Sequence, residues 1–174
     1  MKSYSIEDIL FVDIETTNPD AYSGESNRVI CICVGKFGVD SKRFLNLRSF
    51  YNENETKLLL EFNNFLLNFS KETILCAHNA HELNFPLLHE RMSVNGITSA
   101  SILSNKAILN NLELIDASEF LNTTNFKSSK LKNHSDEQLE DIVSYSFKDI
   151  VSIAQNLLRF KNLSSVSTEN IYYV

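Results

Sequence analysis

The segment Ile9-Leu10-Phe11-Val12-Asp13-Ile14-Glu15 carries four apolar residues in a row and then two acids separated by an isoleucine. A short, continuous apolar run is typical of a strand that is buried on both faces of a sheet. Side chains two residues apart on a strand project from the same face. We therefore expect Asp13 and Glu15 to share one face at the C-terminal end of this strand, where apolar packing does not explain them.

The rest of the chain predicts an α/β domain with a mixed central sheet, because strands in hairpins come first and then alternate with helices. Further strands are predicted at 28–37, 42–47, 73–77 and 112–115, and helices at 55–69, from Pro86 to about Asn95-Gly96, and from Ser135 to about Phe160. Asn54 is an N-cap signal, Gly96 is a C-cap signal, and Ser135 with Gln138 forms a capping box. We expect one domain over 1–162 and a loosely held C-terminal tail over 163–174.

Composition limits the class of protein. The chain has 174 residues, of which 43% are hydrophobic and 22% charged, so it suits one globular domain and is neither fibrous nor wholly disordered. The start of the chain is polar and lacks the apolar run of a signal peptide or a membrane span, so we expect a cytoplasmic protein without a membrane partner. The formal net charge of -6 argues against a protein that binds nucleic acid through bulk electrostatics.

The three cysteines, Cys31, Cys33 and Cys76, form no zinc-ligand pattern. An odd number of cysteines in apolar, strand-like runs favours buried, reduced thiols over a disulfide framework. A metal-binding or redox pair at Cys31 and Cys33 is the alternative.

The acids of the chain have two interpretations. Asp13 and Glu15 are either polar residues where a strand leaves the core, or two hard oxygen donors for Mg²⁺ or Mn²⁺. Tyr145 and Asp149 are four residues apart in a predicted helix and so lie on one of its faces, next to an apolar stripe. Asp149 is thus expected near the core edge, where a carboxylate without a cation or donors is costly.

Between these two regions lies a strand-to-helix junction that contains His78-Asn79 and, further on, Asn84. Taken alone, His78 and Asn79 are also explained by a capped turn. Asp13-Ile14-Glu15, His78-Asn79 with Asn84, and Tyr145-Ser146-Phe147-Lys148-Asp149 together resemble, in order and spacing, the three exonuclease motifs of the DEDD (DnaQ-like) superfamily. Tyrosine at 145, after serine at 144, favours the tyrosine-bearing DEDDy branch. The chain is most similar to predicted 3′–5′ exonucleases related to the proofreading domain of family B DNA polymerases.

The resemblance covers most of Ile9 to Phe160 and implies an RNase H-like fold, with a mixed central sheet flanked by helices. It implies that Asp13, Glu15 and Asp149 ligate one divalent ion, that Asp13 bridges to a second, and that Tyr145 orients the attacking water. Two Mg²⁺ or Mn²⁺ ions suit an in-line phosphodiester displacement. They would also make an acidic pocket attractive to phosphate.

Basic residues near the last predicted helix are candidates for contacts with substrate. The loop that contains Lys127, Lys130, Lys132 and His134 is either solvated or contacts phosphates, and Lys148 lies beside Asp149. No duplex-reading motif is present, so the expected partner is the 3′ end of a single strand. The candidate substrate-binding residues are Thr16, His78, Asn79, Lys127, Lys130 and Lys148.

The chain departs from the family pattern at Asn84, where the second motif supplies a fourth acid. An amide is a neutral and weaker ligand, so occupancy of the second ion should fall and catalysis should be impaired. Asn84 is explained by an engineered inactivation, by a natural low-activity form, or by a binding protein that has lost catalysis. Glu82 or His81 is a candidate substitute for the missing acid.

Three functions remain open on the sequence. The first is a 3′–5′ exonuclease that hydrolyses single-stranded DNA or short RNA to nucleoside 5′-monophosphates, with Asp13, Glu15, Asn84, Tyr145 and Asp149 as its catalytic set. The second is a catalytically silent nucleic-acid-binding or regulatory protein on the same scaffold. The third is an acidic interaction domain without a catalytic site.

Overall fold

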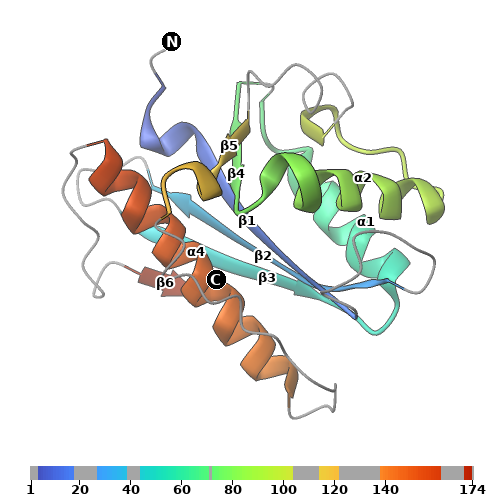
Figure 1. Ribbon diagram of the computed structural model, residues 1–174. Helices are drawn as coiled ribbons and strands as arrows, with labels where there is room; N and C mark the ends of the chain where they lie inside the picture. The colour runs from blue at the N-terminus through green and yellow to red at the C-terminus, as the bar shows by residue number, and fades with distance from the viewer. Residues whose placement is uncertain are drawn as a thin grey trace.

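The computed structural model of the protein describes residues 4–17, 27–38, 44–70, 72–103, 114–121, 138–161 and 171–173. These residues form a six-stranded sheet of order β5-β4-β1-β2-β3-β6 (Figure 1). Its strands are β1 (Ile9–Thr16), β2 (Val29–Phe37), β3 (Leu45–Tyr51), β4 (Ile74–Ala77), β5 (Leu114–Asp116) and β6 (Ile171–Tyr173). The first three form an antiparallel meander, whereas β4 is parallel to β1, β5 to β4, and β6 to β3. The predicted α/β architecture with a mixed sheet is confirmed.

Helices cover both faces of this sheet. Figure 1 shows α1 (Glu55–Leu66) and α2 (Phe85–Val94) on one side and α4 (Gln138–Phe160) on the other. The side chain of Asn54 accepts a hydrogen bond from the backbone nitrogen of Lys57, as its N-cap role predicts. Gly96 follows α2 with a φ of 69°, a left-handed conformation that glycine adopts without steric cost. Short helical turns lie at Ile6–Asp8, Ala80–Asn84, Ser101–Leu103 and Ala117–Glu119.

Alternation along β1 assigns its side chains to two separate cores. Leu10, Val12 and Ile14 pack in the core that contains α1 and α2. Ile9 and Phe11 pack in the core beneath α4. Because odd-numbered side chains face α4, Asp13 and Glu15 project toward that helix.

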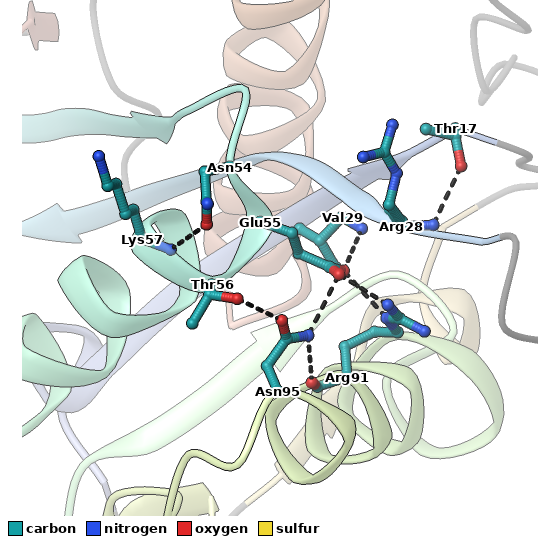
Figure 2. A network of polar contacts seen from close by, with 9 residues as sticks. All are labelled: Thr17, Arg28, Val29, Asn54, Glu55, Thr56, Lys57, Arg91 and Asn95. Atoms are coloured by element: carbon teal, nitrogen blue, oxygen red, sulfur yellow. Dashed lines mark hydrogen bonds and ion pairs between the residues drawn. The ribbon is translucent and has the colours of Figure 1, made fainter.

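A buried ion pair holds together the elements around the core that contains α1 and α2. The carboxylate of Glu55 accepts hydrogen bonds from the Val29 backbone nitrogen at 2.7 Å, from Arg91 Nε at 2.9 Å and Nη2 at 2.6 Å, and from Asn95 Nδ2 at 3.1 Å (Figure 2). Burial alone would raise the pKa of Glu55, but the bonds from Arg91, Val29 and Asn95 hold it below its usual range. Removing one partner of such a pair leaves an uncompensated buried charge, so the pair ties α1, α2 and the start of β2 together.

A glycine on β2 permits the close approach of α4 to the other face. A Cβ atom at Gly35 would lie 2.5 Å from Cγ2 of Ile150 and 3.1 Å from Cδ2 of Leu47. The distance to Ile150 is shorter than carbon atoms tolerate, so any side chain at position 35 would displace α4. Gly35 pairs with Phe11 on β1, two residues before Asp13.

The structure differs from the sequence predictions at several boundaries. The third strand is Leu45–Tyr51 rather than 42–47, and the first helix ends at Leu66 rather than at 69. The expected loosely held tail instead contributes residues 171–173, which pair with β3 as β6. An unpaired edge of β3 offers free backbone donors and acceptors, which a short strand satisfies even without a strong sequence pattern.

No helix within the described ranges combines the length and the apolar character that crossing a membrane requires.

The contact between Gly35 and Ile150 predicts a coupled effect on stability. Gly35→Ala should lower the free energy of unfolding by about 1–3 kcal/mol, because it overpacks the space beneath α4. Ile150→Leu removes the branched methyl group that the new Cβ would meet, so the double variant should recover part of that loss. Urea denaturation of the four proteins measures the coupling, and strictly additive losses would contradict this account.

Candidate functional site

The candidate site lies where β1, β4 and β5 end. These strands are parallel, so their carboxyl ends meet at the same edge of the sheet. Asp13 and Glu15 stand at the end of β1, His78 follows β4, and Asp116 closes β5. Helix α4 packs against β1 and β2 and carries Tyr145 and Asp149 to the face from which Asp13 and Glu15 project.

A buried serine joins β1 to α4. Ser146 is fully buried, and its Oγ donates a hydrogen bond to Oδ2 of Asp13. Sequence reasoning treated Ser146 only as part of a motif. The signal that identifies it is a small polar residue on the apolar stripe of α4, next to Ile142 and Ile150, where a hydroxyl group needs a partner. This bond fixes Asp13 relative to the helix that carries Asp149.

Burial raises the pKa of all three carboxylates, and repulsion adds to the shift at Glu15 and Asp149. Burial raises the pKa of Asp13 to about 6, although hydrogen bonds from Ser146 and from the backbone of Ile14 oppose the shift. Burial, followed by repulsion from Asp13 and Asp149, raises the pKa of Glu15 to about 8. Burial and then repulsion from Asp13 raise the pKa of Asp149 to about 7. Asp13, Glu15 and Asp149 therefore form one electrostatically coupled group.

This group suits a divalent cation in charge and in donor type. Carboxylate oxygens are the ligands that Mg²⁺ and Mn²⁺ prefer, and a bound cation would stabilise the ionised forms that burial and repulsion disfavour. In the described part of the chain, however, no three or more His, Cys, Asp or Glu side chains are already arranged to hold a metal ion. The donors fit a cation, and binding it would require the side chains to close around it.

Asn84 makes a contact that a carboxylate cannot make. It is buried at the end of the π-helical turn Ala80–Asn84, and its Nδ2 donates a hydrogen bond to the carbonyl oxygen of His78. An ionised aspartate at this position has no proton to donate. Asn84 thus stabilises the turn after β4. Glu82, one of the two candidate substitutes for the missing acid, is exposed on the same turn.

Asp116 supports the turn that carries His78 and Asn79. Asn79 adopts a left-handed conformation with φ 50°, which opens the π-helical turn. The carboxylate of Asp116 accepts hydrogen bonds from the backbone nitrogen of His81 at 3.3 Å and from the nitrogen and hydroxyl of Ser118 at 2.9 and 2.6 Å. Burial lowers the pKa of His78, and the charge of Asp116 only partly opposes this shift. His78 is consequently a neutral imidazole at neutral pH.

The remaining candidate residues lie at the rim of the site or outside the described residues. Tyr145 is 38% exposed, and Nζ of Lys148 lies 5.1 Å from the centroid of its ring. Thr16 is buried at the end of β1, where the pairing with β2 shifts register. Lys127 and Lys130 lie outside the described residues.

Two cysteines lie directly across from the acids of β1. Cys33 pairs with Asp13 and Cys31 with Glu15, so both thiols share the face of the carboxylates. The two sulfur atoms are 3.7 Å apart, and Cys31, Cys33 and Cys76 are all buried and free of disulfides, as predicted. The hydrogen bond with Cys33, burial and the nearby carboxylates raise the pKa of Cys31. The two thiols are thus buried neighbours of Asp13 and Glu15 on the same face of the sheet.

No protein-family model matches the chain, and no curated protein matches it by sequence.

The raised carboxylate pKa values predict a pH-dependent stability in the presence of a chelator. The ordinary pKa is 3.8 for aspartate and 4.5 for glutamate, whereas the folded protein has pKa values of about 6 at Asp13, about 8 at Glu15 and about 7 at Asp149. At a pH between the ordinary and the folded values, the folded protein binds more protons than the unfolded chain. The free energy of unfolding should therefore fall as the pH rises from about 4 to about 8.

Asp149→Asn should flatten this decline, because an amide does not ionise and no longer repels Glu15. Asp141→Asn, at an exposed residue in the first turn of the same helix, is the control and should leave the slope unchanged. Urea denaturation across the pH range measures the slope. A decline of equal steepness in Asp149→Asn would show that the coupled carboxylates do not cause it.

Proposed function

We propose that the protein is a metal-dependent 3′–5′ exonuclease of the DEDDy branch that acts on single-stranded DNA or short RNA. The observation that carries the proposal is the coupling of Asp13, Glu15 and Asp149 on one face of the sheet. Tyr145 stands one helical turn before Asp149, on the same side of α4. Three acids gathered at a half-buried edge are costly to the fold, and a site for cations accounts for that cost.

The proposal includes an RNase H-like fold. The order β5-β4-β1-β2-β3, with an antiparallel meander on one side of β1 and two parallel strands on the other, is the arrangement expected of that fold. The last long helix crosses the face that carries the acids, as the resemblance implies. The three free, buried thiols support a cytoplasmic location.

In this mechanism Asp13, Glu15 and Asp149 would hold the divalent ions. Bound ions would supply the positive charge that activates water and stabilises the leaving oxygen of an in-line displacement. Ser146 keeps Asp13 in place through its hydroxyl. The hydroxyl of Tyr145 would orient the water that attacks the terminal phosphorus, and the 3′ oxygen of the preceding nucleotide would leave.

Other residues of this edge bind the strand. His78 and Asn79 lie on the turn that follows β4, at the carboxyl ends of the parallel strands, and His78 is neutral, so both are candidates for contacts that add no charge. Lys148 attracts a phosphate next to Tyr145. Thr16 borders Glu15, and Lys127 and Lys130 remain candidates from the sequence.

Asn84 supports a second candidate function. Its amide contacts the carbonyl of His78 and adds no negative charge, so a second ion would be held weakly. A catalytically silent nucleic-acid-binding or regulatory protein on the same scaffold would keep the turn and the strand contacts but would not hydrolyse.

A nuclease assay tests the proposal. End-labelled single strands of DNA and RNA are incubated with Mg²⁺ or Mn²⁺, and released nucleoside 5′-monophosphates are measured. Asp149→Asn should abolish the activity, whereas Asp141→Asn, at an exposed residue in the first turn of the helix, should retain it. Asn84→Asp should raise the rate on the order of a hundredfold, because it restores charge at the developing transition state.

Two controls complete this test. Asn84→Asp loses the bond to His78 and should unfold about 1–3 kcal/mol more easily, so its stability is measured beside its activity. Calorimetry with Mn²⁺ should show uptake that Asp13→Ala removes. If neither the unchanged protein nor Asn84→Asp cleaves a strand, the exonuclease is excluded. Strand binding without cleavage would favour the catalytically silent nucleic-acid-binding protein. No Mn²⁺ uptake would favour an interaction domain without a catalytic site.

A further inference from the structure

A groove runs along α4 on the side of β3 and β6. Its volume is about 540 Å³, and its walls come from β3, from β6 and from residues 139–155 of α4. Val143, Phe147 and Val151 of α4 line it with apolar surface. Figure 1 shows β6 at the outer edge of the sheet, beside β3 and next to α4.

Two tyrosine rings stand at this groove with much of their surface in solvent. Tyr51 is 53% exposed and Tyr173 is 71% exposed. The ring of Tyr173 leans on Phe147, with centroids 5.3 Å apart, whereas its neighbour Tyr172 points the other way and packs on Phe44 at 4.9 Å. Both Tyr51 and Tyr173 therefore line the groove with much of their aromatic surface still in solvent.

The polar groups of the groove do not repel an anionic strand. Lys148 and Glu140 are its charged lining residues and balance one another, and Ser49, Ser144 and Gln155 add hydroxyl and amide groups. In a chain of net charge -6, this neutral lining admits a phosphate backbone, and Lys148 is the lining cation that a phosphate would contact. Stacking on exposed rings beside a positive charge is how proteins bind single strands without reading their sequence.

Lys148 connects the groove to the carboxylate site. It lines the groove, and its Nζ lies 5.1 Å from the ring centroid of Tyr145, which stands one turn from Asp149. The outer surface of α4 thus offers a continuous path from the carboxylates, past Tyr145 and Lys148, to Tyr51 and Tyr173.

We propose that this groove binds unpaired bases of a single-stranded nucleic acid upstream of its 3′ end, with Tyr51 and Tyr173 as stacking platforms. The inference rests on the proposed function, because it takes the 3′ end to lie at Asp13, Glu15 and Asp149. A duplex keeps its bases stacked on one another, so it cannot place them on these rings.

Fluorescence anisotropy tests the groove without any hydrolysis. Labelled thymidine and uridine strands of about ten nucleotides are titrated with the protein in the presence of a chelator. Tyr173→Ala and Tyr51→Ala should each weaken binding about tenfold, whereas Tyr173→Phe and Tyr51→Phe should retain it because the ring remains. Tyr172→Ala is the matched control, since it removes the same side chain from the opposite face of β6, and it should bind like the unchanged protein.

The outcomes separate this inference from the proposed function. Three results would overturn the proposal that the groove binds a single strand. These are equal affinities of Tyr173→Ala and Tyr172→Ala, equal binding of the matching duplex, and no strand binding at all. If the protein hydrolyses strands and the tyrosine variants keep the same KM for the ten-nucleotide substrate, the exonuclease proposal is supported and strand binding in the groove is excluded. If the variants weaken binding as expected but no form of the protein hydrolyses, strand binding in the groove is supported and the exonuclease proposal is excluded.

Discussion

The burial of β1 on both faces is the constraint on which the rest of the structure depends. A strand with helices on both sides must divide its side chains between two cores, and the pleat leaves no choice of which residues share a face. Once Ile9 and Phe11 pack beneath α4, Asp13 and Glu15 must face the same helix. The carboxylates are thereby held at the edge of an apolar core, which is the physical origin of their raised pKa values.

The position of α4 depends on small side chains of β2. Gly35 lets Ile150 approach the sheet, and Cys31 and Cys33 occupy the places across from Glu15 and Asp13 without filling the space between strand and helix. Ser146 then reaches Asp13 directly. A larger residue at any of these positions would hold the helix away from the acids. The site thus depends on the small side chains of β2 as well as on the acids of β1 and α4.

The net charge of the chain does not describe the charge at the candidate site. The net charge of -6 argues against a broad basic surface for nucleic acid, yet two divalent ions would add about four positive charges at the one edge where acids gather. Lys148 and the tyrosine-lined groove lie beside that edge on α4. The proposed substrate path therefore combines a local positive charge with stacking.

The sequence by itself determined the order and type of the main elements. The apolar run before Asp13, the Asn54 cap and Gly96 act within a few residues, so their local physics can be recognised along the chain. The shared face of Asp13 and Glu15 likewise follows from the strand period alone. Only the tertiary structure decided the contact of Ser146 with Asp13, the amide bond of Asn84 to His78, the close fit at Gly35 and the addition of β6 to the sheet. Each of these contacts joins positions that come together only when the whole sheet and its helices pack. A pattern of neighbouring residues in the sequence cannot predict such contacts.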